Sequence, residues 1–449
     1  MLFIARQCSL QQVTVRLLNP IIFAICVLET SGFSFGKSTD VCTGTAARSA
    51  REYGYLTDPM TLLITMPPTT PYTCFNWIMC FIGLLLYLGD ICTDIWVAVK
   101  YLTRGYVLWF ALTLTFVLLS TVIIQVFSYF WYRDDSGSDS GAAESCALIG
   151  LHFCQLGIFT RYKELLKNGY REIKGKQPCS TEESASEIWG MTADISMLKL
   201  FETHLESVPQ LILQLYIYLE HKEKMTIQYL TLTMSFFSIA WSAVDYQRCL
   251  RRSLPNKKEI SHVPSITVYL LYKMFTITSR VLSFVLLTIF NAHSTLALFG
   301  ITWLCTFIWA WKQQTDFCTS RGLEVFYRII IGAILVFTFF NIKGQSTQSS
   351  MICYYAVSFC ETLCIVILCT CWYPPLTVFS FFLPICIVMF VFFFLGIIFL
   401  LMYYLALHPN KQPSAQFDEV DGTQRSSAQF DEVDGAHSRI ASRINTFLQ

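Results

Sequence analysis

The sequence predicts an all-α polytopic membrane protein with eight transmembrane helices plus two in-membrane, re-entrant half-helices. Of its 449 residues, 54% are hydrophobic and 14% are charged, whereas a soluble domain has about 25% charged residues. From Phe75 onward, apolar segments of about 20 residues, the length that crosses a bilayer, follow one another. The formal net charge of +1 supplies no overall field that would attract nucleic acid, so no nucleic-acid partner is expected.

The apolar segments divide into predicted spans and predicted half-helices. Residues 146–159 offer only about 14 apolar positions, the length of a re-entrant or buried half-helix. Residues 352–374 are long enough to span, but they run into Trp-Tyr-Pro-Pro. The predicted spans are 75–99, 106–130, 197–220, 226–245, 265–290, 296–312, 322–342 and 383–407.

The C-terminal tail, residues 411–449, is polar and contains the stretch Ser-Ala-Gln-Phe-Asp-Glu-Val-Asp-Gly twice. Each copy holds Asp-Glu-Val-Asp followed by glycine, the preferred recognition sequence of executioner caspases. The polar surroundings cannot bury a core, so the tail should be accessible to a protease. A solvated acidic tail without function is the alternative interpretation. The predicted caspase sites comprise Asp418, Asp421 and Gly422 in the first copy and Asp431, Asp434 and Gly435 in the second.

Basic residues set the predicted topology. Lys and Arg are dense in 161–176 and in 248–258, and such clusters mark cytoplasmic segments. If the chain on both sides of 146–159 is cytoplasmic, that segment does not cross. An intracellular caspase must also meet the tail in the cytoplasm, so with a cytoplasmic amino terminus the number of crossings is even. Eight spans satisfy this requirement and nine do not, which favours 352–374 as the second half-helix.

Acidic residues lie inside the predicted spans, where they are costly. Asp90 and Asp94 are four residues apart in the first span, hence on one helix face. Glu202 and Glu206 repeat that spacing at the start of the 197–220 helix. A charge at the centre of a span costs about 2.5–3.5 kcal/mol, so such residues normally face a polar interior and are functional candidates.

Further charges lie on the later helices and permit pairing between helices. Asp245 ends its span, and Arg248 follows one turn on. Two interpretations are open. Buried ion pairs would fix the helix register and have no transport role. A continuous polar track would instead guide a lipid head group while its acyl chains stay in hydrocarbon, and spacing alone does not distinguish this track from an ion or amino-acid pathway.

Enzyme and nucleotide motifs give no support for catalysis. The segment Gly32-Phe-Ser-Phe-Gly36-Lys37-Ser38 resembles a phosphate-binding loop, but it has three residues between its glycines where the motif needs four. The sequence contains no His-Glu-x-x-His motif and no dinucleotide fingerprint. We therefore predict a protein that is not an enzyme, needs no cofactor or metal, and moves any substrate downhill.

From residue 72 to about residue 410 the chain resembles the XK-related membrane proteins, a family that includes caspase-activated phospholipid scramblases. The family fold implied by this resemblance is eight membrane-spanning helices plus two in-membrane half-helices. The motifs that carry it are Leu88-Gly-Asp90-Ile-Cys-Thr-Asp94-Ile-Trp96, Phe159-Thr160-Arg161-Tyr162, the segment from Leu200 to Tyr216, Ala240-Trp241-Ser-Ala-Val-Asp245-Tyr246, Phe339-Phe-Asn341-Ile-Lys343-Gly344 and His408-Pro409-Asn410.

The resemblance implies site residues, partners and domains. The family's polar, membrane-buried positions match Asp90, Asp94, Arg161, Glu202, Glu206, Asp245 and Arg248, as a hydrophilic path or its supporting ion pairs. Residues 1–71 form an N-terminal extension outside the family pattern, 72–410 the helical membrane domain, and 411–449 a flexible cytoplasmic tail. Expected partners are phospholipids including phosphatidylserine, an executioner caspase and, as for some relatives, an accessory single-span membrane protein.

The predicted function is an ATP-independent scramblase of the plasma membrane. It would expose phosphatidylserine during apoptosis, the signal for engulfment, once a caspase removes the inhibitory tail. Both termini would be cytoplasmic. A secondary transporter of amino acids or ions would use the same buried charges as a midplane site. A membrane scaffold that transports nothing is the remaining alternative.

Overall fold

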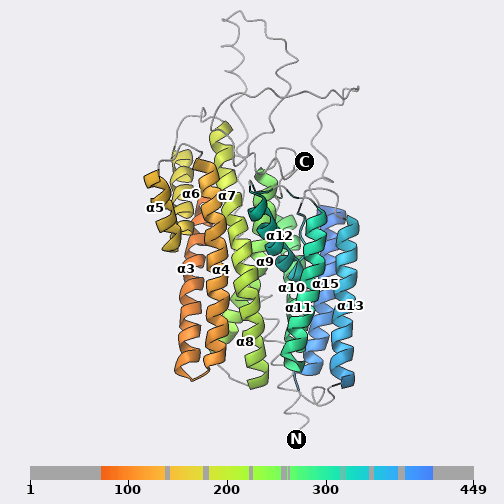
Figure 1. Ribbon diagram of the computed structural model, residues 1–449. Coiled ribbons are helices and arrows are strands. Elements are labelled where there is room, and N and C mark those ends of the chain that lie inside the picture. Colours follow the sequence, from red (N-terminus) through yellow and green to blue (C-terminus); the bar gives the residue numbers. More distant parts are fainter. Residues whose placement is uncertain are drawn as a thin grey trace, which may run out of the picture.

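The computed structural model is all-helical over the residues it describes, which contain no strand. Most helices run roughly parallel and form one elongated bundle (Figure 1). Both the N-terminal extension and the caspase sites in the tail lie outside the described part of the chain. The described residues are 72–407 except for 137–141, 175–181, 222–225, 254–259, 261–262, 314, 316, 319, 343–347 and 373–379.

The first half of the domain pairs long helices with a short helical hairpin. The hairpin of α5 and α6 lies beside α3 and α4 near one end of the bundle (Figure 1). A π-helical turn, η2, joins α7 to α8. The helices are α3 (Cys74–Thr103), α4 (Val107–Ser136), α5 (Ala142–Phe153), α6 (Gly157–Lys174), α7 (Glu182–Glu202), η2 (Thr203–Ser207), α8 (Val208–His221) and α9 (Thr226–Ser253).

The second half is built around α10. This helix is the most buried of the long apolar helices and contacts α8, α9, α11, α13 and α15. Gly396 of α15 lets that helix approach α10 closely, because a Cβ there would lie 2.6 Å from Cγ2 of Thr276. The elements are α10 (Val263–Phe290), α11 (Ala292–Lys312), α12 (Arg321–Phe337), α13 (Gln348–Trp372), α15 (Phe382–Met402) and η3 (Tyr403–Leu407).

Six described helices are long and apolar enough to cross a membrane. Five of them coincide with predicted spans, and the sixth is α13. The consecutive helical elements α7, η2 and α8 do not meet this criterion, and neither do α9 and α12. The predicted count of eight crossings therefore stays a prediction. The six helices cover Cys74–Thr103, Val107–Asp134, Val263–Phe290, Ala292–Lys312, Gln348–Cys371 and Phe382–Leu407.

The structure offers two candidates for the second half-helix. Residues 352–374 were predicted not to cross; residues 352–372 of this segment lie in α13, a helix of 25 residues that is long and apolar enough to span. The helix ends at Trp372. The predicted span 322–342 contains instead the shorter helix, α12, which has 17 residues and turns to extended backbone at Thr338.

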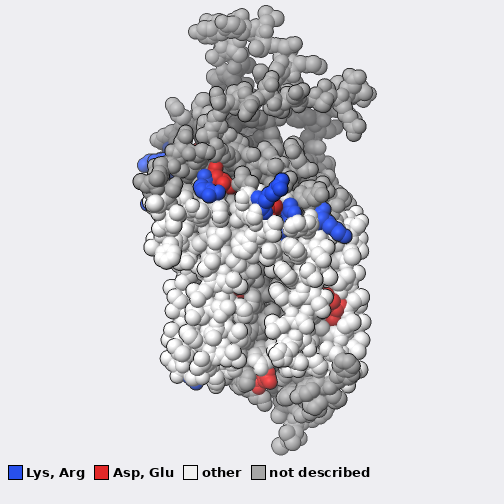
Figure 2. Space-filling model, in the orientation of Figure 1, with Lys and Arg blue, Asp and Glu red and all other residues white. Residues whose placement is uncertain are grey.

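The side chains facing outward are apolar, and the charges gather at one end. Large hydrophobic side chains are exposed along α3, α4, α11, α13 and α15, as expected of helices that face lipid. On the face drawn in Figure 2, most Lys and Arg side chains lie at one end of an otherwise largely uncharged body, the end near which α5 and α6 lie in Figure 1. A concentration of Lys and Arg at one end is the pattern on which the predicted topology rests.

Candidate functional site

The candidate site includes the π-helical turn η2, which lies between α7 and α8. Pro209, the second residue of α8, has no N–H, and in a regular helix its ring would clash with the carbonyl four residues earlier. A π turn accommodates such a residue, and π turns recur at functional sites. Here the turn includes the buried side chains of Thr203, His204 and Glu206. It therefore carries one of the acidic residues singled out by the sequence.

Three carboxylates meet between α3 and η2. One oxygen each from Asp90, Asp94 and Glu206 lie within 4.8 Å of one another, and the carboxyl groups of Asp94 and Glu206 interact directly. The exposed fractions of Asp94 and Glu206 are 7% and 4%. Two carboxylates at this distance repel unless a proton or a cation lies between them. We call Asp90, Asp94 and Glu206 the acidic cluster.

Two charged side chains of α7 complete its surroundings. Glu202 is buried at the end of α7 and interacts electrostatically with Asp90. Lys199, one helical turn earlier, acts on both Asp90 and Glu202. The sequence reasoning missed Lys199, although a residue three positions before Glu202 lies on the same helix face. Lys199 thus acts on two of these four acidic groups.

The acidic cluster can bind positive charge. Carboxylate oxygens are the ligands that hard divalent cations prefer, and they also attract the ammonium groups of lipid head groups. The cluster lies in the middle of α3, a helix long enough to span the membrane. It is therefore suited to a cationic group inside the bundle.

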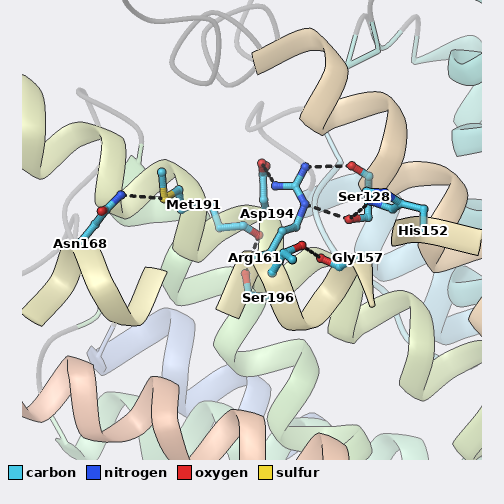
Figure 3. Close-up of polar contacts among 10 residues, drawn as sticks. Ser128, His152, Gly157, Arg161, Asn168, Met191, Asp194 and Ser196 are labelled. Atoms are coloured by element: carbon cyan, nitrogen blue, oxygen red, sulfur yellow. Dashed lines mark hydrogen bonds and ion pairs between the residues drawn. The ribbon is translucent and has the colours of Figure 1, made fainter. Parts of the chain in front are cut away.

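Arg161 lies in a different environment, which Figure 3 shows. Its Nη1 is 3.3 Å from Oδ2 of Asp194 on α7. Its Nε donates to Oγ of Ser128 at 3.0 Å and its Nη2 to the Ser128 carbonyl at 3.1 Å. Nε2 of His152 on α5 lies 3.1 Å from the same Oγ, and its Nδ1 lies 2.9 Å from the Leu148 carbonyl. We call Ser128, His152, Arg161 and Asp194 the arginine network; it ties α6 to α4, α5 and α7.

The turn between α5 and α6 needs a glycine at position 157. A Cβ on Gly157 would lie 2.3 Å from Cδ2 of His152 and 2.4 Å from Oε1 of Gln125. Gln155, in the same turn, has a φ of 64°, a conformation uncommon for residues other than glycine. The hairpin is therefore closely packed against α4, and His152 is part of that packing.

Buried cations of α10 hold the C-terminal end of α12. Nε of Arg280 donates to the Val336 carbonyl at 3.0 Å, and Nη2 of Arg280 is 2.5 Å from Oε2 of Glu361 on α13. Nζ of Lys273 donates to Oγ1 of Thr338 at 3.0 Å. A helix end inside a bundle leaves carbonyls without helical partners, and cations at this end also complement the helix dipole.

The N-terminal end of α12 is held as well. Nε of Arg328 is 3.1 Å from Oε1 of Glu324, and the other Glu324 oxygen accepts from the Cys318 amide at 2.8 Å. Oγ1 of Thr315 donates to Oε1 of Glu324 at 2.5 Å. Charged side chains therefore fix both ends of this short helix.

The structure brings some predicted site residues together and not others. Asp90, Asp94 and Glu206 meet, and Glu202 lies near them. Asp245 and Arg248 lie part-buried on α9, where Asp245 acts on Cys80 and Tyr162 rather than on the acidic cluster. The tail residues Asp418, Asp421, Gly422, Asp431, Asp434 and Gly435 lie outside the described residues.

Comparison with known proteins identifies the family. The model of the XK-related proteins matches residues 78–409. The chain belongs to the XK-related family. It is 40% identical to XK-related protein 9 of Tetraodon nigroviridis, over 79% of this chain and 96% of that relative. It is 31% identical to XK-related protein 8 of Tetraodon nigroviridis, over 77% and 86% of the two chains. XK-related protein 8 of Gasterosteus aculeatus is 32% identical, over 76% and 85%. These matches confirm the family that the sequence motifs indicated.

Proposed function

We propose that this XK-related protein is an ATP-independent phospholipid scramblase of the plasma membrane, which exposes phosphatidylserine during apoptosis. The observation that carries the proposal is the acidic cluster, three carboxylates within 4.8 Å of one another between α3 and η2. Its members lie inside a bundle of apolar helices, where an unmatched charge is costly and marks function. A lipid head group with an ammonium group complements them.

Eight crossings and two half-helices form part of this proposal. In this proposal α7, η2 and α8 together make one crossing. The other seven crossings are α3, α4, α9, α10, α11, α13 and α15. The hairpin of α5 and α6 and the short α12 enter from the cytoplasmic end and return to it. The C-terminal end of α12 lies beside the middle of α10, where it contacts Lys273 and Arg280. A helix that ends at this depth supports the assignment of α12 as a half-helix. An even count leaves both termini in the cytoplasm.

The tail supplies the control. An intact tail would dock on the cytoplasmic face and hold the protein inactive. A tethered segment has a high effective concentration at its own site, which is lost once the tether is cut. Cleavage by an executioner caspase after Asp421 or Asp434 would therefore release inhibition even if the docking contacts are weak. Because the motif occurs twice, loss of one aspartate leaves a working site.

Cells that lack other scramblases test the switch. The double variant Asp421→Ala, Asp434→Ala should expose no phosphatidylserine after an apoptotic stimulus, whereas each single variant should respond as the unaltered protein does. Normal exposure by the double variant would overturn the switch. If the protein needs an accessory single-span partner, it should reach the cell surface only when the two proteins are expressed together.

A secondary transporter is the second candidate, favoured by the interruption at η2. Transporters bind substrates where a helix is broken near the middle of the membrane, and η2 places Glu206 at such a point. Liposomes that hold the purified chain separate the possibilities. Lipid flip without solute uptake supports the scramblase, and uptake of amino acids or ions without flip supports the transporter. Neither flux, with or without the tail, would indicate a scaffold.

A further inference from the structure

We propose that the outward face of the α5–α6 hairpin is a binding surface for anionic phospholipid head groups of the cytoplasmic leaflet. The tip of the hairpin would lie among the acyl chains, and the basic side chains of α6 would lie at head-group level. The proposal rests on the membrane orientation given under the proposed function. It does not require that the protein scrambles lipids.

The depth of the hairpin follows from its contacts with α3. Nε1 of Trp77, in the first turn of α3, donates to the Leu166 carbonyl of α6 at 2.9 Å. Further along α3, the ring of Tyr87 packs on Phe159 at the start of α6, with 5.6 Å between ring centroids. The two helices are therefore antiparallel. Thirteen residues of α3, about 20 Å at 1.5 Å per residue, separate Cys74 from Tyr87, so the hairpin tip lies level with the middle of α3.

The tip is apolar and covered by no other described part of the chain. The exposed fractions of Ile149, Phe153 and Leu156 are 53%, 85% and 48%. Large apolar side chains exposed together mark a contact surface. Because α3 beside the tip is long and apolar enough to cross a membrane, the environment that suits these side chains is the acyl region of the bilayer.

Basic side chains continue from the tip along the outward face of α6. Lys163, Lys167, Arg171 and Lys174 are all exposed, and their spacing of four, four and three residues places them on one helix face. The opposite face is buried, with Leu165 and Gly169 packed inward. The helix is therefore amphipathic, with the arrangement typical of helices at a membrane surface.

The level of these residues suits lipid head groups. Trp77 bonds to α6 at Leu166, and tryptophan is enriched at the membrane interface. Lys167, Arg171 and Lys174 lie at or beyond this level, towards the end of the bundle. Lys163 lies one turn deeper, where a lysine can extend its ammonium group to the interface. Tyr170, also exposed on α6, adds an aromatic ring of the kind found at the interface.

Charge complementarity identifies anionic lipid as the occupant. The cytoplasmic leaflet carries anionic lipids, and each Lys or Arg near its surface contributes about 1 kcal/mol to binding. Glu164, an acidic residue on the same helix, accepts a hydrogen bond from Tyr132 at 2.5 Å and so points towards α4. The hairpin would thereby gather anionic lipids next to α3, the helix that carries Asp90 and Asp94.

Photo-labelling of the purified full chain in nanodiscs tests the assignment. The probes are phosphatidylserine and phosphatidylcholine with the same photoreactive acyl chain, and mass spectrometry identifies the labelled peptides. We expect the serine probe to label the peptides of 146–174 several-fold more than the choline probe. In the variant Lys167→Gln, Arg171→Gln this preference should fall to nearly equal labelling, because two surface charges, each contributing about fivefold to binding, are lost.

The matched control removes the same charge elsewhere. Lys312 and Arg321 are exposed basic residues outside the hairpin, and Lys312→Gln, Arg321→Gln should leave the preference unchanged. Equal labelling of the unaltered chain by the two probes, or a preference that the hairpin variant leaves intact, would overturn the assignment. Cross-links from the hairpin to residues 411–449 in place of the lipid would assign this face to the tail. None of these outcomes depends on lipid flip, so a failed scrambling assay would not be mistaken for a failure of this proposal.

Discussion

The acidic cluster and the arginine network both lie among the first helices of the domain, but they differ in charge balance. The arginine network pairs opposite charges, whereas the acidic cluster brings like charges together. In the arginine network, Arg161 has one acidic partner, Asp194, and three of its nitrogens donate to protein oxygens. In the acidic cluster, three carboxylates crowd together with Lys199 as the nearby cation. A matched network stabilises the fold, whereas an unmatched cluster lowers stability and can bind a cationic ligand.

Breaking the matched network should have the largest effect on stability. Arg161→Met removes the buried cation that lies 3.3 Å from the Asp194 carboxylate, and breaking a buried ion pair costs about 3–5 kcal/mol. We expect a clear fall in the unfolding temperature in detergent and a low yield of folded protein. The double variant Arg161→Met, Asp194→Leu removes both charges and should recover much of the loss. If Arg161→Met alone unfolds at the temperature of the unaltered protein, the network does not stabilise the fold.

Overpacking the hairpin turn should have the next largest effect. Gly157→Ala places a Cβ 2.3 Å from His152, and relieving such a contact costs about 1–3 kcal/mol. Gly150→Ala on α5 is the matched control, because nothing lies within 4 Å of its added Cβ. Thermal unfolding should separate the two variants. Equal unfolding temperatures would show that the turn tolerates the side chain and that the hairpin is loosely held.

Removing the shared hydroxyl of the arginine network should have a smaller effect. Ser128→Ala deletes the oxygen that accepts from Nε of Arg161 at 3.0 Å, while the bond to the Ser128 carbonyl remains. A lost hydrogen bond to a charged group costs about 1–2 kcal/mol, so the unfolding temperature should fall less than for Arg161→Met. A fall as large as that for Arg161→Met would mean that the hydroxyl, rather than Asp194, holds the arginine.

Neutralising the unmatched cluster should change stability least. Asp94→Asn removes a charge that two carboxylates oppose, so the free energy of unfolding should stay within about 1 kcal/mol or rise. Asp194→Asn, the same chemical change in the matched network, should lower it. A loss of stability for Asp94→Asn equal to that for Asp194→Asn would remove the contrast between the two regions.

The sequence predicted the parts of the structure that depend on local spacing. Asp90 and Asp94 lie on one face of a membrane helix because four residues make about one turn. The family followed from motifs within short stretches. Two members of the acidic cluster were thus visible as a pair before the structure showed that Glu206 meets them.

What the sequence did not predict depends on contacts between distant segments. Asp194 was not singled out, because its partner Arg161 is 33 residues away and no spacing rule joins two helices. The π turn around Glu206 follows from Pro209, which was quoted as part of a motif but not read as a backbone constraint. The second half-helix was assigned to 352–374 because the number of crossings had to be even, and the contacts of α10 with the C-terminal end of α12 were not visible in the sequence.

Lipid flip in liposomes tests most directly whether the acidic cluster belongs to a scramblase. The purified chain is reconstituted with a fluorescent phospholipid, and the loss of accessible label to an external quencher is measured before and after caspase treatment. We predict fast flip only after cleavage, and much slower flip for cleaved Asp94→Asn, Glu206→Gln with unchanged thermal stability. Equal flip by the cleaved variant and the cleaved unaltered chain, or no flip by either, would contradict this account.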